Sequence, residues 1–262
     1  MEAMYQLYRI CLEAGEEILK VYHEEIDVEY KSDDSPLTIA DQRAHDTIVR
    51  GLQRFDSSIP VLSEEGKEKD YDTRKQWEQF WLVDPLDGTK EFIKKNGEFT
   101  VNIALIEGHY PVSGVIYAPA LDTFYFGSKD QGAYKLEKAS ERSIQDVDDL
   151  IAQSTQLPFV DNPDVTHVVA SRSHMSEETE DFIQSLEGPV DVVSSGSSLK
   201  FCLVAEGKAD YYPRYAPTME WDTGAGQAIV EAAGGQVTRY EDDERFDYNR
   251  EDLLNGWFLA KR

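Results

Sequence analysis

The chain is poor in basic residues and has no long apolar segment, and each shortage excludes a class of protein. Its 262 residues include 26 Lys and Arg against 51 Asp and Glu, which gives a net charge of −25. Such a surface repels polyanions, so a protein that binds nucleic-acid polymers is not expected. No apolar run approaches the ~18 residues that span a bilayer, and the acidic residues 1–18 do not resemble a signal peptide. We therefore expect a cytoplasmic protein without a transmembrane segment.

Cysteine and histidine are also sparse. The two cysteines, Cys11 and Cys202, lie in apolar stripes of predicted helices, so we expect buried thiols in a reducing compartment. The five histidines do not have the spacing of zinc ligands. A metal centre in this chain would therefore be built from oxygen ligands.

The first half of the chain reads as two amphipathic helices and a sheet. The apolar stripes predict the first helix over residues 2–22. Two strands are expected to end at Ser63 and Asp84, with Pro85 stopping the second one. The strands within residues 99–134 follow one another without helices between them, which indicates an antiparallel sheet.

In the second half, beyond a polar stretch at residues 150–165, strands and helices alternate. This pattern is typical of a smaller, mostly parallel sheet. We therefore predict two subdomains that share a core, residues 1–155 and 156–262. The expected fold is mixed α and β, a five-layer αβαβα sandwich with helices between and outside the two sheets.

Acidic residues follow two of the predicted strands and begin one predicted helix. The turn Asp-Pro-Leu-Asp-Gly-Thr carries Asp84 and Asp87 at one strand end, and Glu64 and Glu65 directly follow the other strand. Asp222 lies in the first turn of a helix and points the same way as its apolar face. Alone, each would be a solvated turn or an acid favoured by the helix dipole. Together, their carboxylates are the hard oxygen ligands that suit Mg²⁺.

Gly88, Thr89 and Asp41 add features of a phosphate site. Gly88 lets a ligand approach the backbone closely, and Thr89 opens a short helix whose N–H groups suit a phosphate oxygen. Asp41 follows Thr38 at the spacing of a capping box, which is a structural device. It is also in register with the apolar Ile48, so it faces inward. Capping and catalysis both remain open on spacing alone.

These motifs, taken in order, resemble the signature of the magnesium-dependent, lithium-sensitive phosphatases, which include the inositol monophosphatases. The matching residues are Asp41, Glu64-Glu65, DPLDGT (84–89) and WDTGAG (221–226). Segments 81–106, 170–174 and 194–226 are similar to the CysQ-type branch of that family, the 3'(2'),5'-bisphosphate nucleotidases. The resemblance covers nearly the whole chain, and it implies the five-layer sandwich.

The resemblance also implies a role for each matching residue. The implied ligands of two or three Mg²⁺ ions are Glu64, Asp84, the Leu86 carbonyl, Asp87 and Asp222. The implied catalytic residues are Asp41, Glu65 and Thr89, with Thr89 and Asp41 orienting the attacking water. The implied contacts of the reacting phosphate are Glu64, Leu86, Asp87, Gly88, Thr89 and Asp222.

A substrate with two phosphates needs a second anion site. Ser197 is predicted to start a helix, and Lys200 lies one turn on along the same side. Arg214 follows a strand whose end is expected nearby. His174 either packs against an adenine or is a capping or surface histidine. On the resemblance, the expected reaction is hydrolysis of 3'-phosphoadenosine 5'-phosphate to AMP and phosphate, as part of nucleotide recycling in sulfate assimilation.

Two other functions compete with this one. A phosphatase of inositol or sugar phosphates would share the carboxylates, but a substrate with one phosphate has no use for Ser197, Lys200 and Arg214. A non-catalytic, metal-binding regulatory protein would not need Asp41 and Thr89 together. The full set therefore favours a nucleotidase.

Overall fold

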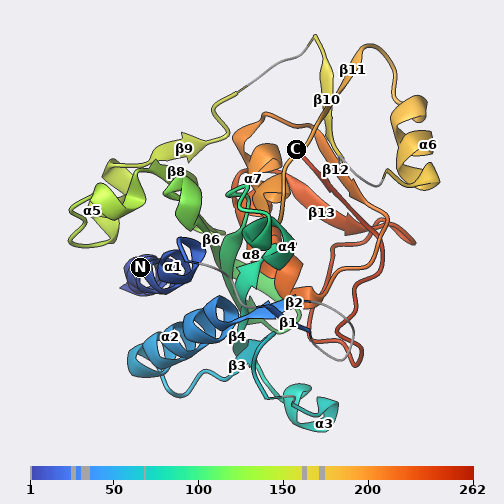
Figure 1. The fold of residues 1–262 in the computed structure, drawn as a ribbon. Coiled ribbons are helices and arrows are strands. Elements are labelled where there is room, and N and C mark those ends of the chain that lie inside the picture. Colours follow the sequence, from blue (N-terminus) through green and yellow to red (C-terminus); the bar gives the residue numbers. More distant parts are fainter. Residues whose placement is uncertain (1, 25–27, 31–35, 68, 161–163, 171–174) are drawn as a thin grey trace.

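Two sheets form the frame of the molecule (Figure 1). The structure, a computed structural model, describes residues 2–24, 28–30, 36–67, 69–160, 164–170 and 175–262. Within these ranges the larger sheet has seven strands in the order β3-β4-β5-β6-β7-β8-β9, which are Val61–Ser63, Gln79–Asp87, Thr100–Glu107, Tyr110–Ala118, Thr123–Ser128, Gly132–Glu137 and Thr155–Leu157. The smaller one has five described strands in the order β11-β10-β12-β14-β13, which are Val190–Val193, Thr166–Val169, Tyr211–Arg214, Phe258–Lys261 and Gln236–Arg239. Strands β1 (Val28–Tyr30) and β2 (Pro36–Thr38) pair separately.

Helices lie on both faces of the larger sheet and on both faces of the smaller sheet. Helices α1 (Glu2–Tyr22) and α2 (Ile39–Phe55) lie on the outer face of the larger sheet, α7 (Leu199–Glu206) and α8 (Glu220–Ala232) lie between the sheets, and α6 (Glu177–Ser185) lies beyond the smaller sheet. The short helical segments are α3 (Tyr71–Arg74), α4 (Thr89–Ile93), η1 (Pro119–Leu121), η2 (Ala139–Glu141) and α5 (Val147–Ala152). The layers confirm the predicted αβαβα sandwich. No helix in the described ranges is long and apolar enough to cross a membrane.

The alternation of side chains between the two faces of each strand explains why there are two cores. In β4, Trp81 and Val83 pack with α1 and α2, whereas Phe80 and Leu82 pack with α7 and α8. Successive side chains of a strand point to opposite faces, so a continuous apolar run serves a sheet that is covered on both sides. Both cysteines are buried, as expected, one in each core.

Strand directions depart from the prediction in part. The described pairs of the larger sheet are antiparallel except for the parallel pair β3–β4. In the smaller sheet β10 pairs parallel with β11 and with β12, but β14 pairs antiparallel with β12 and β13. The prediction of a mostly parallel sheet therefore does not extend to β13 and β14. The segment between these two strands contains no helix, and the crossover between two parallel strands is usually a helix.

The chain changes sheet close to the predicted boundary. Strand β9 still belongs to the larger sheet and ends at Leu157, and β10 opens the smaller sheet at Thr166. The division into subdomains 1–155 and 156–262 stays a prediction.

Gly114 on β6 determines how closely α8 lies against the larger sheet. A Cβ atom at this position would lie 2.7 Å from the carbonyl oxygen of Ala225 and 2.8 Å from the Cβ of Ala228. No side-chain rotation relieves contacts with backbone and Cβ atoms. The absence of a side chain at Gly114 therefore sets the position of the helix that carries Asp222.

We predict that Gly114→Ala lowers the free energy of unfolding by about 1–3 kcal/mol, the usual cost of overpacking. Urea unfolding followed by circular dichroism measures this change. Ser113→Ala is the matched control, because its side chain is on the other face of the sheet. Equal stability of the two variants would show that α8 does not depend on this contact.

Candidate active site

Asp84 and Asp87 lie at the C-terminal end of β4, where its pairing with β5 becomes irregular. The strand continues through Pro85 to Asp87, so the prediction that Pro85 stops it is wrong. The register shifts between Asp84 and Asp87, and a proline without an N–H is tolerated at such a bulge. The N–H of Leu86 donates to Oδ1 of Asp84 at 3.0 Å, which fixes that carboxylate.

A third carboxylate, from α8, completes an acidic cluster. Asp84, Asp87 and Asp222 each offer an oxygen, and these atoms lie within 4.8 Å of one another. Asp84 is only 1% exposed. The N–H of Met219 donates to Oδ2 of Asp222 at 2.8 Å. The side chain of Asp222 therefore caps its helix and belongs to the cluster at the same time.

Burial and mutual repulsion raise the pKa values of all three carboxyl groups. Burial is the largest cause in each case, and the charge of Glu64 adds to it. The pKa of Asp84 lies well above its ordinary range, that of Asp87 is raised to about 6 and that of Asp222 to about 8. The charge of Lys200 opposes the rise at Asp87. Such a cluster favours anything that brings positive charge, whether protons or a cation.

The two adjacent glutamates after β3 point to different neighbours. The N–H of Glu64 donates to the carbonyl of Val83 at 3.1 Å, and its charge acts on all three cluster residues. Glu65 instead contacts α2, since its Oε2 accepts a hydrogen bond from Nε2 of Gln42 at 3.4 Å. Glu64 thus lies with the cluster, and Glu65 lies beside the N-terminal part of α2.

Asp41 makes the capping contact that its spacing predicts, and it also contacts Thr89. Its Oδ2 accepts hydrogen bonds from the N–H of Thr38 at 2.8 Å and from the hydroxyl of Thr38 at 2.7 Å, as part of a capping box at the start of α2. Its Oδ1 accepts from the hydroxyl of Thr89 at 3.3 Å, and that hydroxyl is also 3.4 Å from the carbonyl of Leu86. The cap therefore directs the other carboxylate oxygen toward Thr89.

Gly88 lies at a close approach between the two halves of the chain. It is the N-cap of α4, with φ of 88°, and a Cβ there would lie 3.1 Å from that of Ser197 and 3.2 Å from the carbonyl oxygen of Glu98. Both the left-handed backbone and the crowding favour glycine. The predicted phosphate donors, the N–H groups of Gly88 and Thr89, thus lie at the start of a short helix beside Ser197.

Lys200 and Arg214 lie together next to the cluster. Both line one cavity, and its lining residues are Ala170, Met175, Ser176, Thr179, Lys200, Tyr212, Pro213, Arg214, Tyr215 and Ala216. Burial lowers the pKa of Lys200, Asp87 opposes this change, and the charge of Arg214 adds to it. Two cations therefore share one cavity beside the carboxylates.

Two details of this second region differ from the prediction or lie outside it. Helix α7 begins at Leu199 rather than at Ser197, because Ser197 has φ of 45° and Ser198 is the N-cap. Nζ of Lys200 donates to the carbonyl of Ser197 at 2.8 Å, so these two residues do lie together. His174 is outside the described residues, and its contact with adenine stays a prediction.

A buried polar relay that we did not predict connects Asp87 with the start of α7. Nδ2 of Asn102 donates to Oδ2 of Asp87 at 3.4 Å, and the hydroxyl of Ser198 donates to Oδ1 of Asn102 at 2.7 Å. The hydroxyls of Ser198 and Thr100 are 2.7 Å apart. The signal was present in the sequence: Thr100 and Asn102 are polar residues two apart at the start of an apolar strand, so they share one face.

Comparisons with known proteins give a consistent result. A family model described as the inositol monophosphatase family matches residues 1–259. Two curated relatives are named 3'(2'),5'-bisphosphate nucleotidase CysQ: that of Salmonella typhimurium is 46% identical and that of Escherichia coli K12 is 44% identical, each over 97% of both chains. A crystal structure of CysQ from Bacteroides thetaiotaomicron has a TM-score of 0.89 and 49% identity, and covers 98% of this chain and 97% of that one. The chain therefore belongs to the inositol monophosphatase family.

Proposed function

We propose that this chain is a 3'(2'),5'-bisphosphate nucleotidase that hydrolyses 3'-phosphoadenosine 5'-phosphate to AMP and phosphate. The observation that carries the proposal is that two cationic side chains, Lys200 and Arg214, lie beside the acidic cluster. The charge of Lys200 acts on Asp87, and that of Arg214 acts on Asp222. One region suits the reacting phosphate with its metal, and the other suits a second phosphate. The names of the relatives support the same activity.

The donor set of the cluster fits Mg²⁺. Three carboxylate oxygens within 4.8 Å of one another are hard ligands, and this cluster contains neither histidine nor cysteine. The proposed ligands of two or three ions are Asp84, Asp87, Asp222, Glu64 and the Leu86 carbonyl. Bound Mg²⁺ supplies positive charge for the phosphate and for the attacking water. Lithium sensitivity, which the family resemblance implies, is part of this proposal.

The residues around the cluster bind and orient the reactants. Asp41 accepts the hydroxyl hydrogen of Thr89, so the oxygen of Thr89 presents its lone pairs to a hydrogen bond from the attacking water. The N–H groups of Gly88 and Thr89 hold phosphate oxygens at the start of α4. Glu65 stays a proposed catalytic residue, with its contact to Gln42. A protein that only bound metal would have no use for the Asp41–Thr89 contact, which favours catalysis.

We also propose a cytoplasmic location. Cys11 and Cys202 are both free and buried thiols. Free thiols persist in a reducing compartment.

Replacing Lys200 or Arg214 distinguishes a bisphosphate nucleotidase from a phosphatase of inositol or sugar phosphates. Lys200→Ala or Arg214→Ala removes a charge-assisted contact worth roughly 1.5–3 kcal/mol. We predict that kcat/KM for 3'-phosphoadenosine 5'-phosphate falls by about one to two decades, at ~1.4 kcal/mol per decade. Hydrolysis of 3'-AMP, which lacks the second phosphate, should change much less. Phosphate release at saturating Mg²⁺ measures both.

Lys129→Ala is the matched control, because Lys129 is an exposed lysine in the turn between β7 and β8. It should leave both activities unchanged. Equal losses on both substrates in the Lys200 and Arg214 variants, or none on either, would remove these residues from the nucleotide site. A phosphatase of inositol or sugar phosphates would then be the better assignment.

The raised pKa values of Asp87, to about 6, and Asp222, to about 8, predict how Mg²⁺ affects stability. Between the ordinary value of 3.8 and these values, the metal-free folded protein binds more protons than the unfolded chain. Its stability therefore falls as pH rises through that window. A cation relieves the same repulsion, so we expect Mg²⁺ to raise Tm more at pH 8 than at pH 5.5.

Thermal unfolding with and without saturating Mg²⁺ at both pH values measures this difference. KCl at matched ionic strength controls for general screening of the acidic surface. If Mg²⁺ raises Tm equally at the two pH values, or no more than KCl does, the cluster is not where Mg²⁺ binds.

A further inference from the structure

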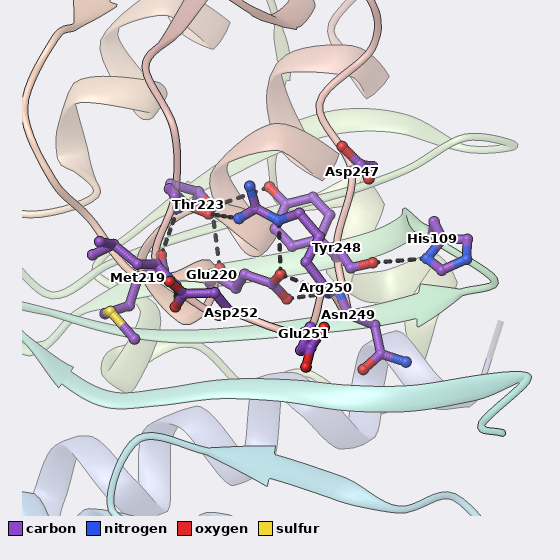
Figure 2. Close-up of polar contacts among 12 residues, drawn as sticks. His109, Met219, Glu220, Thr223, Asp247, Tyr248, Asn249, Arg250, Glu251 and Asp252 are labelled. Atoms are coloured by element: carbon purple, nitrogen blue, oxygen red, sulfur yellow. Dashed lines mark hydrogen bonds and ion pairs between the residues drawn. The ribbon is translucent and has the colours of Figure 1, made fainter. Parts of the chain in front are cut away.

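A buried polar network begins at Glu220, the first residue of α8. Glu220 is 0% exposed and precedes Asp222 by two residues. Figure 2 shows its carboxylate directed at the chain segment after β13. Oε2 accepts from the N–H of Asn249 at 2.7 Å, and Oε1 accepts from the N–H of Arg250 at 3.0 Å and from its Nε at 3.1 Å. Both oxygens are therefore engaged by two consecutive residues.

The network reaches Asp222 through the N-cap of α8. Nδ2 of Asn255 donates to the carbonyl of Met219 at 2.8 Å and lies 3.2 Å from the hydroxyl of Thr223. Nη2 of Arg250 donates to Oδ1 of Asn255. Since the N–H of Met219 donates to Asp222, the segment that contacts Glu220 also contacts the N-cap residue to which Asp222 is hydrogen-bonded.

At its other end the network is bound to Arg74, at the end of α3. This guanidinium is buried. Its Nη1 donates to Oδ1 of Asn249 at 2.9 Å and to the carbonyl of Arg250 at 3.1 Å, Nη2 donates to the carbonyl of Glu251 at 3.2 Å, and Nε donates to that of Lys69 at 3.0 Å. Nδ2 of Asn249 donates back to the carbonyl of Arg74 at 2.8 Å. Arg74 thus ties the loop after β3 to the same segment.

The two ends of the network face each other across a cavity. Glu64, Lys69 and Arg74 line it from one side, and Met219 and Trp221 line it from the other, around a volume of about 330 Å³. Side chains therefore do not fill the space between the loop of Glu64 and the start of α8. The hydrogen bonds of residues 249–255 connect the two sides along one wall of this cavity, which Glu251, Asp252 and Leu253 also line.

Burying these charges is costly unless every oxygen and nitrogen is hydrogen-bonded, and an apolar group of similar size often stabilises a fold better. Glu220 and Arg74 have little reason to be charged for stability alone. Each of them lies close in sequence to a proposed metal ligand. Glu220 is in the same helical turn as Asp222, and Arg74 is at the end of the loop that begins at Glu64.

We propose that Glu220, acting through Asn249 and Arg74, is a positioning residue that sets the spacing between Glu64 and Asp222. These two are the proposed metal ligands that do not come from the end of β4. The inference rests on the proposed function for the identity of the ligands. Without this network, the two carboxylates would still be present, but their separation would no longer match the metal ions that they would hold together with Asp84.

Glu220→Gln tests the proposal, because it keeps the volume of the side chain but replaces one acceptor oxygen with an NH₂ group. That NH₂ group cannot accept the hydrogen bonds that Asn249 and Arg250 donate. Binding of Mn²⁺, used as the probe, is measured from the electron paramagnetic resonance signal of the free ion. We expect its dissociation constant to rise by about 10–100-fold, as is typical when a partner behind the metal ligands is lost. Thermal unfolding of the same samples reports the loss of stability separately.

Glu206→Gln is the matched control. Glu206, on α7, is another buried glutamate, which accepts from the hydroxyl of Tyr125 at 2.6 Å and pairs with Lys135 at 3.0 Å. Its loss should lower Tm and leave Mn²⁺ affinity unchanged. Unchanged affinity in Glu220→Gln, or equal weakening in both variants, would overturn the proposal.

Arg74→Lys serves where Glu220→Gln fails to fold. It keeps the charge but loses the planar fork of donors, and the same weakening of Mn²⁺ binding is expected. Wild-type affinity in Arg74→Lys would overturn the proposal. A wild-type chain that does not bind Mn²⁺ would instead contradict the proposed function, so the two failures are distinct.

Discussion

Three carboxylates held within 4.8 Å of one another are the constraint on which the site depends. Their repulsion and burial oppose ionisation, so the rest of the fold has to hold them together. Asp84 and Asp87 are fixed by the paired end of β4, and Asp222 by the close packing of α8 on Gly114. Clusters with perturbed pKa values of this kind are typical of functional sites. The stacked layers thus serve to bring one strand end and one helix start to the same point.

Helix capping orients the two acids that come from helices. Asp41 and Asp222 both stand three residues after an N-cap, at α2 and α8, and each accepts the N–H of that N-cap residue. A carboxylate anchored in this way cannot rotate freely. In Asp41 the second oxygen is thereby directed at Thr89. The capping contact is therefore compatible with the catalytic role that we propose for Asp41, because it orients the oxygen that contacts Thr89.

The sequence predicted those parts of the site that depend on residues close together in the chain. The parts that depend on contacts between distant residues were not predicted. Spacing and the family resemblance predicted the acids at the strand ends and the helix of Asp222. They also predicted that Lys200 and Arg214 lie near each other. Pro85 was misjudged because its strand accepts a bulge that only the partner strand reveals. The partners of Glu220 lie near residue 250, in a segment without periodic pattern, so no spacing rule links them. The antiparallel β14 escaped prediction for the same reason.

A net charge of −25 makes the binding of a nucleotide with two phosphates a specific problem. In the function that we propose, local positive charge offsets the general repulsion, through Lys200 and Arg214 on one side and a bound cation on the other. The most direct test of this account is phosphate release by the wild-type protein from 3'-phosphoadenosine 5'-phosphate and from inositol 1-phosphate, each with and without Mg²⁺. The account predicts Mg²⁺-dependent release with a clear preference, in kcat/KM, for the nucleotide. Equal rates on both substrates, or undiminished release without divalent ions, would contradict it.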